Sequence, residues 1–103
     1  MYEDATVQGC FILNHRKRSL SKNGVDIPLT QLEYQIVDYL FKNPGRLIYR
    51  NEILTAVWGE AYLGEEKIVD VNIRRLRLKM EDDSSNPAYL KTVWGQGGYK
   101  WSV

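Results

Sequence analysis

The sequence predicts an α+β domain with a small antiparallel sheet, three helices and a closing β-hairpin, in that order along the chain. Three observations predict it: an Asn-Gly turn between short N-terminal runs, helical apolar spacing in three central segments, and a glycine-rich tip between two strand-like runs near the C-terminus. With 103 residues, 44% hydrophobic and 26% charged, the chain has the size and composition of one globular domain. We therefore expect a single domain over residues 1–103.

The N-terminal segment carries two turn patterns, "NHRK" and "KNGV", between short mixed runs. Asn23 and Gly24 both tolerate positive φ, which is the requirement of a tight hairpin turn. We expect residues 6–28 to form a small antiparallel sheet, with Cys10 as a core thiol and His15 as a solvated turn residue.

The first helix is predicted within "LTQLEYQIVDYLFKNPG". Thr30 and Glu33 have the spacing of a capping box, in which each side chain accepts a hydrogen bond from a backbone N–H at the helix start. Asn43-Pro44-Gly45 is a helix-ending sequence. One buried stripe is expected from apolar residues spaced by four: Leu32, Ile36 and Leu40.

"YRNEILTAVWGE" predicts a shorter second helix that ends near Gly59. Its core positions are expected to be Ile53, Leu54 and Val57. Residues 60–66 form a connecting loop, and a third, basic helix is expected from about residue 67 to residue 81. The following "DDSSNP" is loop-forming, and "AYLKTVWGQGGYKWSV" is expected to close the fold as a hairpin.

The basic helix has two different faces when its residues are placed about 100° apart around the helix axis. A narrow apolar stripe should pack inward: Val69, Ile73, Leu76 and Met80. The opposite face is basic with two apolar residues: Lys67, Val71, Arg74 and Leu78, with Arg75 at its margin. Arg77 and Asp70 lie on one flank, and Asn72 lies on the other.

Two interpretations of this basic face stay open. Arginine and lysine on a helix most often form a solvated charged face. Paired arginines beside an outward Val71 favour a helix in the DNA major groove, where arginine reads guanine and a small apolar side chain meets a thymine methyl. Two helices, a loop and a hairpin follow the order of a winged helix-turn-helix, whose second helix enters that groove. The alternative is a winged-helix protein–protein interaction module that uses the same basic helix.

Charge and rare residues exclude several other classes. The net charge of +1 excludes a globally basic nucleic-acid binder, so any such function must come from local charge. One cysteine and one histidine cannot form an internal disulfide or a Cys/His metal site, and no acid–base constellation predicts an enzyme. We therefore expect no cofactor and no metal. We also expect no membrane span, since the longest apolar run is Cys10–Leu13. A cytoplasmic protein is expected.

Five segments together, by their order and spacing, resemble the OmpR/PhoB-type winged-helix effector domain of bacterial response regulators: "LTQLEYQIVDYL", "NPGRLIYRNEIL", "AVWG", "VDVNIRRLRLKMEDD" and "YLKTVWGQGGYKW". The resemblance covers essentially the whole chain. It implies a winged helix-turn-helix with an N-terminal four-stranded antiparallel sheet, three helices and a C-terminal β-hairpin wing. It also implies sequence-specific double-stranded DNA binding for transcription regulation, as the output domain of a two-component response regulator.

The resemblance implies further partners. Relatives bind direct-repeat half-sites as head-to-tail pairs, and they sit behind a phosphorylatable receiver domain controlled by a sensor kinase. No receiver domain lies within this chain. The loop over residues 59–66 corresponds to a segment that some relatives use to contact RNA polymerase.

The resemblance also implies roles for individual residues. The recognition-helix contacts fall on Lys67, Val71, Asn72, Arg74, Arg75 and Arg77. Arg50 and Trp58 match positions that approach the DNA backbone, and Thr92 matches a phosphate contact before the wing. We expect base contacts from Arg74, Arg75 and Asn72, whereas backbone positioning is expected from Lys67, Arg77, Thr92, Arg50 and Trp58.

Four positions depart from the family pattern. Trp94 is also expected among the DNA-binding residues, although it occupies the wing position where many relatives carry an arginine for the minor groove. The tip "GQGGY" is one residue longer than usual. Leu78 stands where relatives often have lysine. Tyr49 replaces a common N-cap serine, so the second helix is expected to begin differently.

Overall fold

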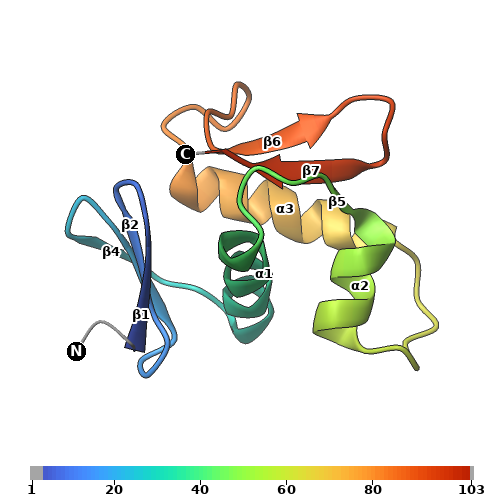
Figure 1. The fold of residues 1–103 in the computed structure, drawn as a ribbon, viewed down its shortest axis with the longest axis horizontal. Helices are drawn as coiled ribbons and strands as arrows, with labels where there is room; N and C mark the ends of the chain where they lie inside the picture. The colour runs from blue at the N-terminus through green and yellow to red at the C-terminus, as the bar shows by residue number, and fades with distance from the viewer. Residues whose placement is uncertain (1–3, 103) are drawn as a thin grey trace.

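The computed structural model describes residues 4–102, which form two antiparallel sheets and three helices (Figure 1). The N-terminal sheet and helix α2 lie at opposite ends of the molecule, with α1 between them and α3 alongside the C-terminal hairpin. The predicted winged helix-turn-helix order is confirmed.

The N-terminal sheet has four strands that pair in sequence order: β1 (Ala5–Gln8), β2 (Phe11–Asn14), β3 (Ser19–Lys22) and β4 (Val25–Ile27). The β3–β4 turn contains Asn23 at φ 51° and Gly24 at φ 79°, as its sequence predicted. Alternation along each strand turns one face inward, where Phe11, Leu13 and Leu20 are fully buried.

Helix α1 (Gln31–Lys42) begins with the predicted capping box. The Glu33 N–H donates to Thr30 Oγ1 at 3.2 Å, and the Thr30 N–H donates to Glu33 Oε1 at 2.8 Å. Ile36 and Leu40 of the predicted stripe are fully buried, whereas Leu32 is half-buried. Asn43 caps the other end of the helix, as predicted.

A short strand between the first two helices was not predicted. Strand β5 (Ile48–Tyr49) pairs with β7 (Gly98–Trp101), which also pairs with β6 (Leu90–Val93) to make the order β5-β7-β6. Gly98 permits this pairing because a Cβ there would lie 2.4 Å from the carbonyl oxygen of Ile48. The hairpin of β6 and β7 is the wing.

Helix α2 (Arg50–Trp58) starts directly after β5, and its C-cap residue is Gly59, whose φ is 96°. Its N-cap residue, Tyr49, makes no side-chain capping hydrogen bond, which agrees with the expected loss of an N-cap serine.

Helix α3 (Lys67–Met80) ends one residue earlier than predicted. Glu81 has extended backbone, and its buried carboxylate accepts hydrogen bonds from the N–H groups of Ala88, Tyr89 and Leu90. These bonds tie the end of α3 to the start of β6. The predicted inward stripe of α3 is confirmed, because Val69, Ile73, Leu76 and Met80 are almost completely buried.

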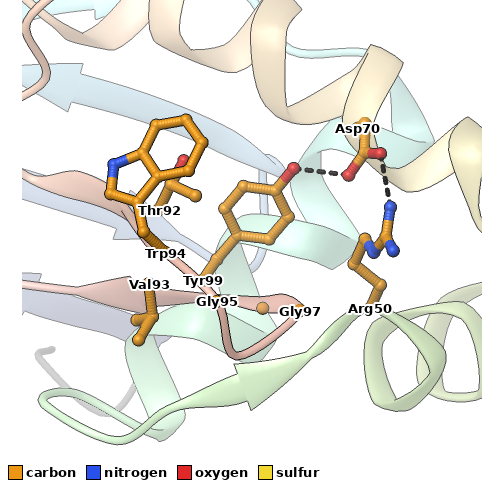
Figure 2. A pocket seen from close by; sticks show the side chains of 9 residues that line it. Arg50, Asp70, Thr92, Val93, Trp94, Gly95, Gly97 and Tyr99 are labelled. Carbon is orange, nitrogen blue, oxygen red and sulfur yellow. Dashed lines mark hydrogen bonds and ion pairs between the residues drawn. The ribbon is translucent and has the colours of Figure 1, made fainter.

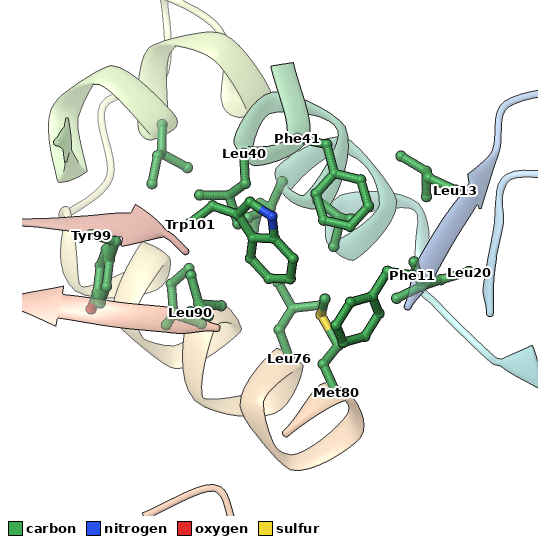
Figure 3. Close-up of a cluster of buried hydrophobic side chains, with 14 of the residues drawn as sticks. Phe11, Leu13, Leu20, Leu40, Phe41, Leu76, Met80, Leu90, Tyr99 and Trp101 are labelled. Carbon is green, nitrogen blue, oxygen red and sulfur yellow. The ribbon is translucent and has the colours of Figure 1, made fainter. Parts of the chain in front are cut away.

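The core joins the sheet, the helices and the wing through aromatic side chains (Figure 3). Trp101 of β7 is fully buried, with its ring centroid 5.4 Å from that of Phe11 in β2 and 4.8 Å from that of Phe41 in α1. Burying these large rings together supplies much of the apolar stabilisation available to a domain of this size. The wing is therefore packed onto the body of the domain at its base.

His15 lies in a turn, as predicted, but its side chain is partly buried and bonded rather than simply solvated. Its Nε2 lies 2.7 Å from Thr6 Oγ1 and its Nδ1 lies 2.8 Å from the Tyr34 hydroxyl, so the ring links the sheet to α1. A turn position predicts exposure only from local sequence, whereas these partners come from other elements. Cys10 is partly buried against the core, with Sγ 3.8 Å from the Tyr89 hydroxyl.

Candidate nucleic-acid interface

The basic residues of α3 divide into two groups with different roles. Arg77 donates from Nε to the Leu90 carbonyl at 2.9 Å and from Nη2 to Thr92 Oγ1 at 2.8 Å. Lys79 donates to Glu33 Oε1 at 2.6 Å and thereby fixes α3 to the start of α1. These two cations stabilise the fold, because each is committed to partners in a neighbouring element.

The second group points into solvent. Lys67, Arg74 and Arg75 are exposed, and among residues 4–102 none of the three has a side-chain hydrogen bond or an ion pair. Val71 and Leu78 share this face and are 41% and 65% exposed, as predicted. The outward face of α3 is therefore a row of uncompensated positive charge with apolar side chains between the cations.

The two exposed arginines lie on different sides of this row. Arg74 is separated from Asp70 by four residues and from Arg77 by three, so it neighbours the flank of α3 that contacts the wing. Arg75 is rotated by about 100° from Arg74, away from the wing. Val71 lies between them, so the face presents arginine, small apolar group and arginine in turn.

A shallow hollow of about 320 Å³ lies between the start of α2, the wing-facing flank of α3 and the wing itself (Figure 2). Asp70 is central to it: Arg50 Nη1 donates to Asp70 Oδ2 at 2.9 Å, and the Tyr99 hydroxyl donates to Asp70 Oδ1. Burial and the Asp70 carboxylate raise the pKa of Tyr99 above its usual value, so the phenol stays protonated and keeps donating. Thr92 and Trp94 line the same hollow.

Arg50, expected to approach the DNA backbone, is paired with two carboxylates of the chain itself. Besides Asp70, its guanidinium lies 3.9 Å from Glu66, and the hydrogen bond to Asp70 raises the pKa of Arg50. The side chain is about one-third exposed and borders the hollow. A phosphate at this place would therefore meet an arginine already oriented and partly neutralised by a carboxylate.

Asn72 does not reach the outward face. Its side chain is almost fully buried, and its amide nitrogen donates to the Ile68 carbonyl at 2.9 Å within α3. A buried amide satisfied by its own helix cannot read a base edge, so the structure argues against the base contact expected from the family pattern. The helical wheel places Asn72 on a flank of α3 but does not predict that this side chain is buried.

Three other predicted residues have side chains that already contact the rest of the fold. Arg77 is half-buried, and burial lowers the pKa of its guanidinium. The guanidinium carbon lies 5.5 Å from the centroid of the Tyr99 ring. Thr92 uses its hydroxyl oxygen to accept from Arg77. Trp58, the last residue of α2, is half-buried against the core and lies 6.2 Å from the Tyr62 ring, measured between ring centroids.

The wing turn places Trp94 in solvent, with 86% of its surface exposed. Gly95 and Gly97 have φ of 77° and 71°, so the extra glycine of the tip is used for left-handed turn conformations. Sequence reasoning missed Tyr99 as a contributor to the site and did not pair Asp70 with Arg50. The spacing of Asp70 and Arg74 instead matches an ion pair within one helix, which does not form here.

Three comparisons relate this geometry to known proteins. The family described as "Transcriptional regulatory protein, C terminal" matches residues 24–101. The uncharacterized transcriptional regulatory protein YcbL of Bacillus subtilis is 42% identical over 79 residues, which make up 77% of this chain and 35% of that protein.

Two solved structures have closely similar folds. Response regulator DrrB of Thermotoga maritima, an OmpR/PhoB homologue, superposes with a TM-score of 0.87 at 28% identity, covering 97% of this chain and 45% of that one. The Klebsiella pneumoniae RstA DNA-binding domain, solved in complex with the RstA box, gives 0.84 at 26% identity, covering 95% and 96%. The chain thus spans less than half the length of YcbL and of DrrB.

Membrane-spanning helices and metal-binding clusters were also sought among the described residues. Among residues 4–102, no helix is long and apolar enough to cross a membrane. The same residues contain no group of three or more His, Cys, Asp or Glu side chains placed to hold a metal ion.

Proposed function

The chain belongs to the family of C-terminal domains of transcriptional regulatory proteins, and from this premise we propose that it binds double-stranded DNA sequence-specifically through α3. One observation carries the proposal: α3 presents Arg74 and Arg75 without partners while its other arginine, Arg77, is committed to the wing. An exposed pair of uncompensated arginines costs self-repulsion unless a polyanion neutralises it. The proposed activity is binding, with no catalytic step.

The order of side chains on the outward face suits the major groove. Arg74 and Arg75 can each donate two hydrogen bonds to guanine O6 and N7, and Val71 between them can contact a thymine methyl. Lys67 at the start of the helix is placed to contact a phosphate. The finer assignments are that Arg50, Thr92 and Trp58 position the DNA backbone and that Arg77 acts mainly by holding the wing. Asn72 is left out because it is buried.

The remaining partners in the proposal concern the longer protein. We propose that residues 1–103 act as one output domain behind a receiver domain and a sensor kinase, in the cytoplasm, and that two copies bind direct-repeat half-sites. When two copies bind neighbouring half-sites together, the overall affinity for DNA rises although each domain makes the same contacts. RNA polymerase is proposed to meet the loop over residues 59–66, where Leu63 is 97% exposed.

The test is fluorescence anisotropy of the chain with a pool of randomised duplexes over a salt series. We expect log K to fall with log salt at about −0.9 per neutralised phosphate. Arg74→Ala/Arg75→Ala should lose affinity, because each well-placed bidentate arginine contributes about 1–3 kcal/mol of discrimination. A matched control removes the same charge from an exposed turn of the N-terminal sheet, Arg16→Ala/Lys17→Ala.

Selection from the pool by the native chain should enrich a repeated motif, and the control variant should bind like the native chain. Equal losses in the two double variants would mean that only overall charge matters and would contradict readout by α3. No binding at low salt, with every variant folded, would refute the proposed function and point to a protein partner on the same helix.

A further inference from the structure

Asp70 is the one acidic residue in the sequence of α3, and it stands four positions before Arg74. An acid four residues ahead of a base is the favourable order for an ion pair on a helix, because the two side chains lie on neighbouring turns of one face. Such a pair would cancel the charge of an arginine that the outward face needs for binding a polyanion. Among residues 4–102, however, Arg74 makes no ion pair.

The carboxylate of Asp70 is occupied from outside α3 (Figure 2). Arg50, at the start of α2, donates from Nη1 to Oδ2 at 2.9 Å, and the Tyr99 hydroxyl, on β7, donates to Oδ1. Both donors line the same hollow as Asp70. A carboxylate held at both oxygens cannot rotate toward Arg74 without giving up one of these charge-assisted hydrogen bonds.

Tyr99 is the more rigid of the two donors. Its side chain is buried, and its strand β7 pairs with both β5 and β6. Burial and the Asp70 carboxylate raise the pKa of Tyr99, so the phenol keeps its proton at neutral pH. Arg50 is about one-third exposed and has Glu66 3.9 Å away as a second partner, so its bond to Asp70 is more easily exchanged.

We propose that Tyr99 is a positioning residue for DNA recognition: together with Arg50 it holds the Asp70 carboxylate away from Arg74, which leaves the Arg74 guanidinium free to bind DNA. The inference rests on the proposed function, and it requires no contact between Tyr99 and DNA. Without the phenol hydroxyl, Oδ1 of Asp70 is free to accept from Arg74. The apparent affinity for DNA then falls in proportion to the fraction of molecules in which Arg74 is unpaired.

The experiment uses Tyr99→Phe, which removes one oxygen and keeps the packed ring. Binding is measured by anisotropy with a duplex enriched by the native chain, at one fixed salt concentration. Tyr39→Phe is the matched control, because the Tyr39 hydroxyl donates to Glu52 Oε2 at 2.6 Å and Arg46 pairs with the same carboxylate, between α1 and α2. A cooperative thermal melt first establishes that each variant is folded.

The effect of Tyr99→Phe is measured in three backgrounds, so that the general effect of each background change on charge cancels. In the native chain we expect binding to weaken about tenfold, equivalent to about 1.4 kcal/mol. In an Asp70→Asn chain we expect no loss, because a carboxamide has no charge with which to pair Arg74. In an Arg74→Ala chain we also expect no loss, because the side chain that Tyr99 protects is gone. Tyr39→Phe should bind like the native chain.

A second readout needs no DNA. The side-chain Nε–Hε signal of Arg74 in the ¹⁵N-labelled chain is identified by its loss in Arg74→Lys. In the native chain this proton should exchange rapidly with water, as expected of an exposed guanidinium without a partner. In Tyr99→Phe the exchange should be slower, because Asp70 then accepts from Arg74.

An equal loss of affinity from Tyr99→Phe in all three backgrounds would overturn the inference, because the hydroxyl would then act on DNA or on the fold without Asp70 and Arg74. Unchanged affinity of Tyr99→Phe in the native background would overturn it as well. Arg74 exchange that is the same in the native chain and in Tyr99→Phe would overturn it whether or not the chain binds DNA. Failure of the native chain to bind any duplex at low salt would instead refute the proposed function.

Discussion

Replacement of Glu81 by alanine tests how the end of α3 is joined to the wing. The Glu81 carboxylate uses both oxygens: Oε1 accepts from Ala88 N–H at 2.7 Å, and Oε2 accepts from Leu90 N–H at 2.8 Å. Tyr89 N–H lies 3.2 Å from each oxygen. Glu81→Ala would leave these N–H groups without an acceptor at a buried junction.

The size of the effect follows from the hydrogen bonds lost. One hydrogen bond to a charged group contributes a net stabilisation of about 1.5–3 kcal/mol. The bonds accepted by one carboxylate are not additive. We therefore expect Glu81→Ala to lower the free energy of unfolding by about 3 kcal/mol. Glu81→Gln keeps one acceptor oxygen but turns an NH₂ donor toward the other N–H groups. It should therefore cost about half as much.

The assay is urea unfolding followed by tryptophan emission, to which the fully buried Trp101 contributes. A loss of about 3 kcal/mol moves the midpoint by about 1–3 M urea for a typical slope of this protein size. Glu65→Ala, at an exposed carboxylate in the loop before α3, is the control and should shift stability by less than about 0.5 kcal/mol. A Glu81→Ala midpoint within the error of the control would refute the assigned role of Glu81.

Two other predictions concern stability. Gly98→Ala should destabilise the domain by about 1–3 kcal/mol in a thermal melt, because its Cβ would overlap the carbonyl oxygen of Ile48; an unchanged melting temperature would contradict the close β5–β7 approach. Burial raises the pKa of Glu33, but hydrogen bonds from Lys79 and from the Thr30 N–H outweigh it and hold the net pKa below 4.5. The stabilising contribution of Glu33 is therefore full above pH 4.5 and is lost as the pH falls through the lower folded pKa. Glu33→Gln, which can keep the cap, should flatten the acid limb of a stability–pH curve, and an identical limb in both proteins would contradict this account.

Local sequence chemistry accounts for the parts of the fold that were predicted. The capping box of Thr30 and Glu33, the Asn23-Gly24 turn and the inward stripe of α3 each depend on residues close together in the chain. Such features follow from backbone preference and spacing alone. The family resemblance added the strand number of the first sheet, which the turn patterns by themselves did not give.

The features that were missed depend on contacts between distant segments. Strand β5 has two residues, too few for any periodic pattern, and it exists because Gly98 lets β7 approach. The four basic side chains of residues 74–79 are indistinguishable by composition, yet Arg77 and Lys79 are committed to Thr92 and Glu33. Only the partners, supplied by other elements, separate cations that hold the fold from cations left free for a ligand.

Asn72 shows the same limit. A helical wheel gives the direction of its side chain but not what covers that direction, and in the folded domain the amide is buried and bonds to Ile68. Of the residues predicted on α3, the structure leaves Lys67, Val71, Arg74 and Arg75 exposed on the outward face, and it buries Asn72.

The most direct test of the central claim, that the outward face of α3 meets DNA, is a residue-resolved one. Amide chemical shifts of the ¹⁵N-labelled chain would be followed as a duplex enriched by the native chain is added. The account predicts that the shifted amides cluster on α3 around Val71, Arg74 and Arg75 and on the wing at Trp94, while β1–β4 stay unperturbed. Shifts centred on the N-terminal sheet, with α3 unchanged, would contradict it.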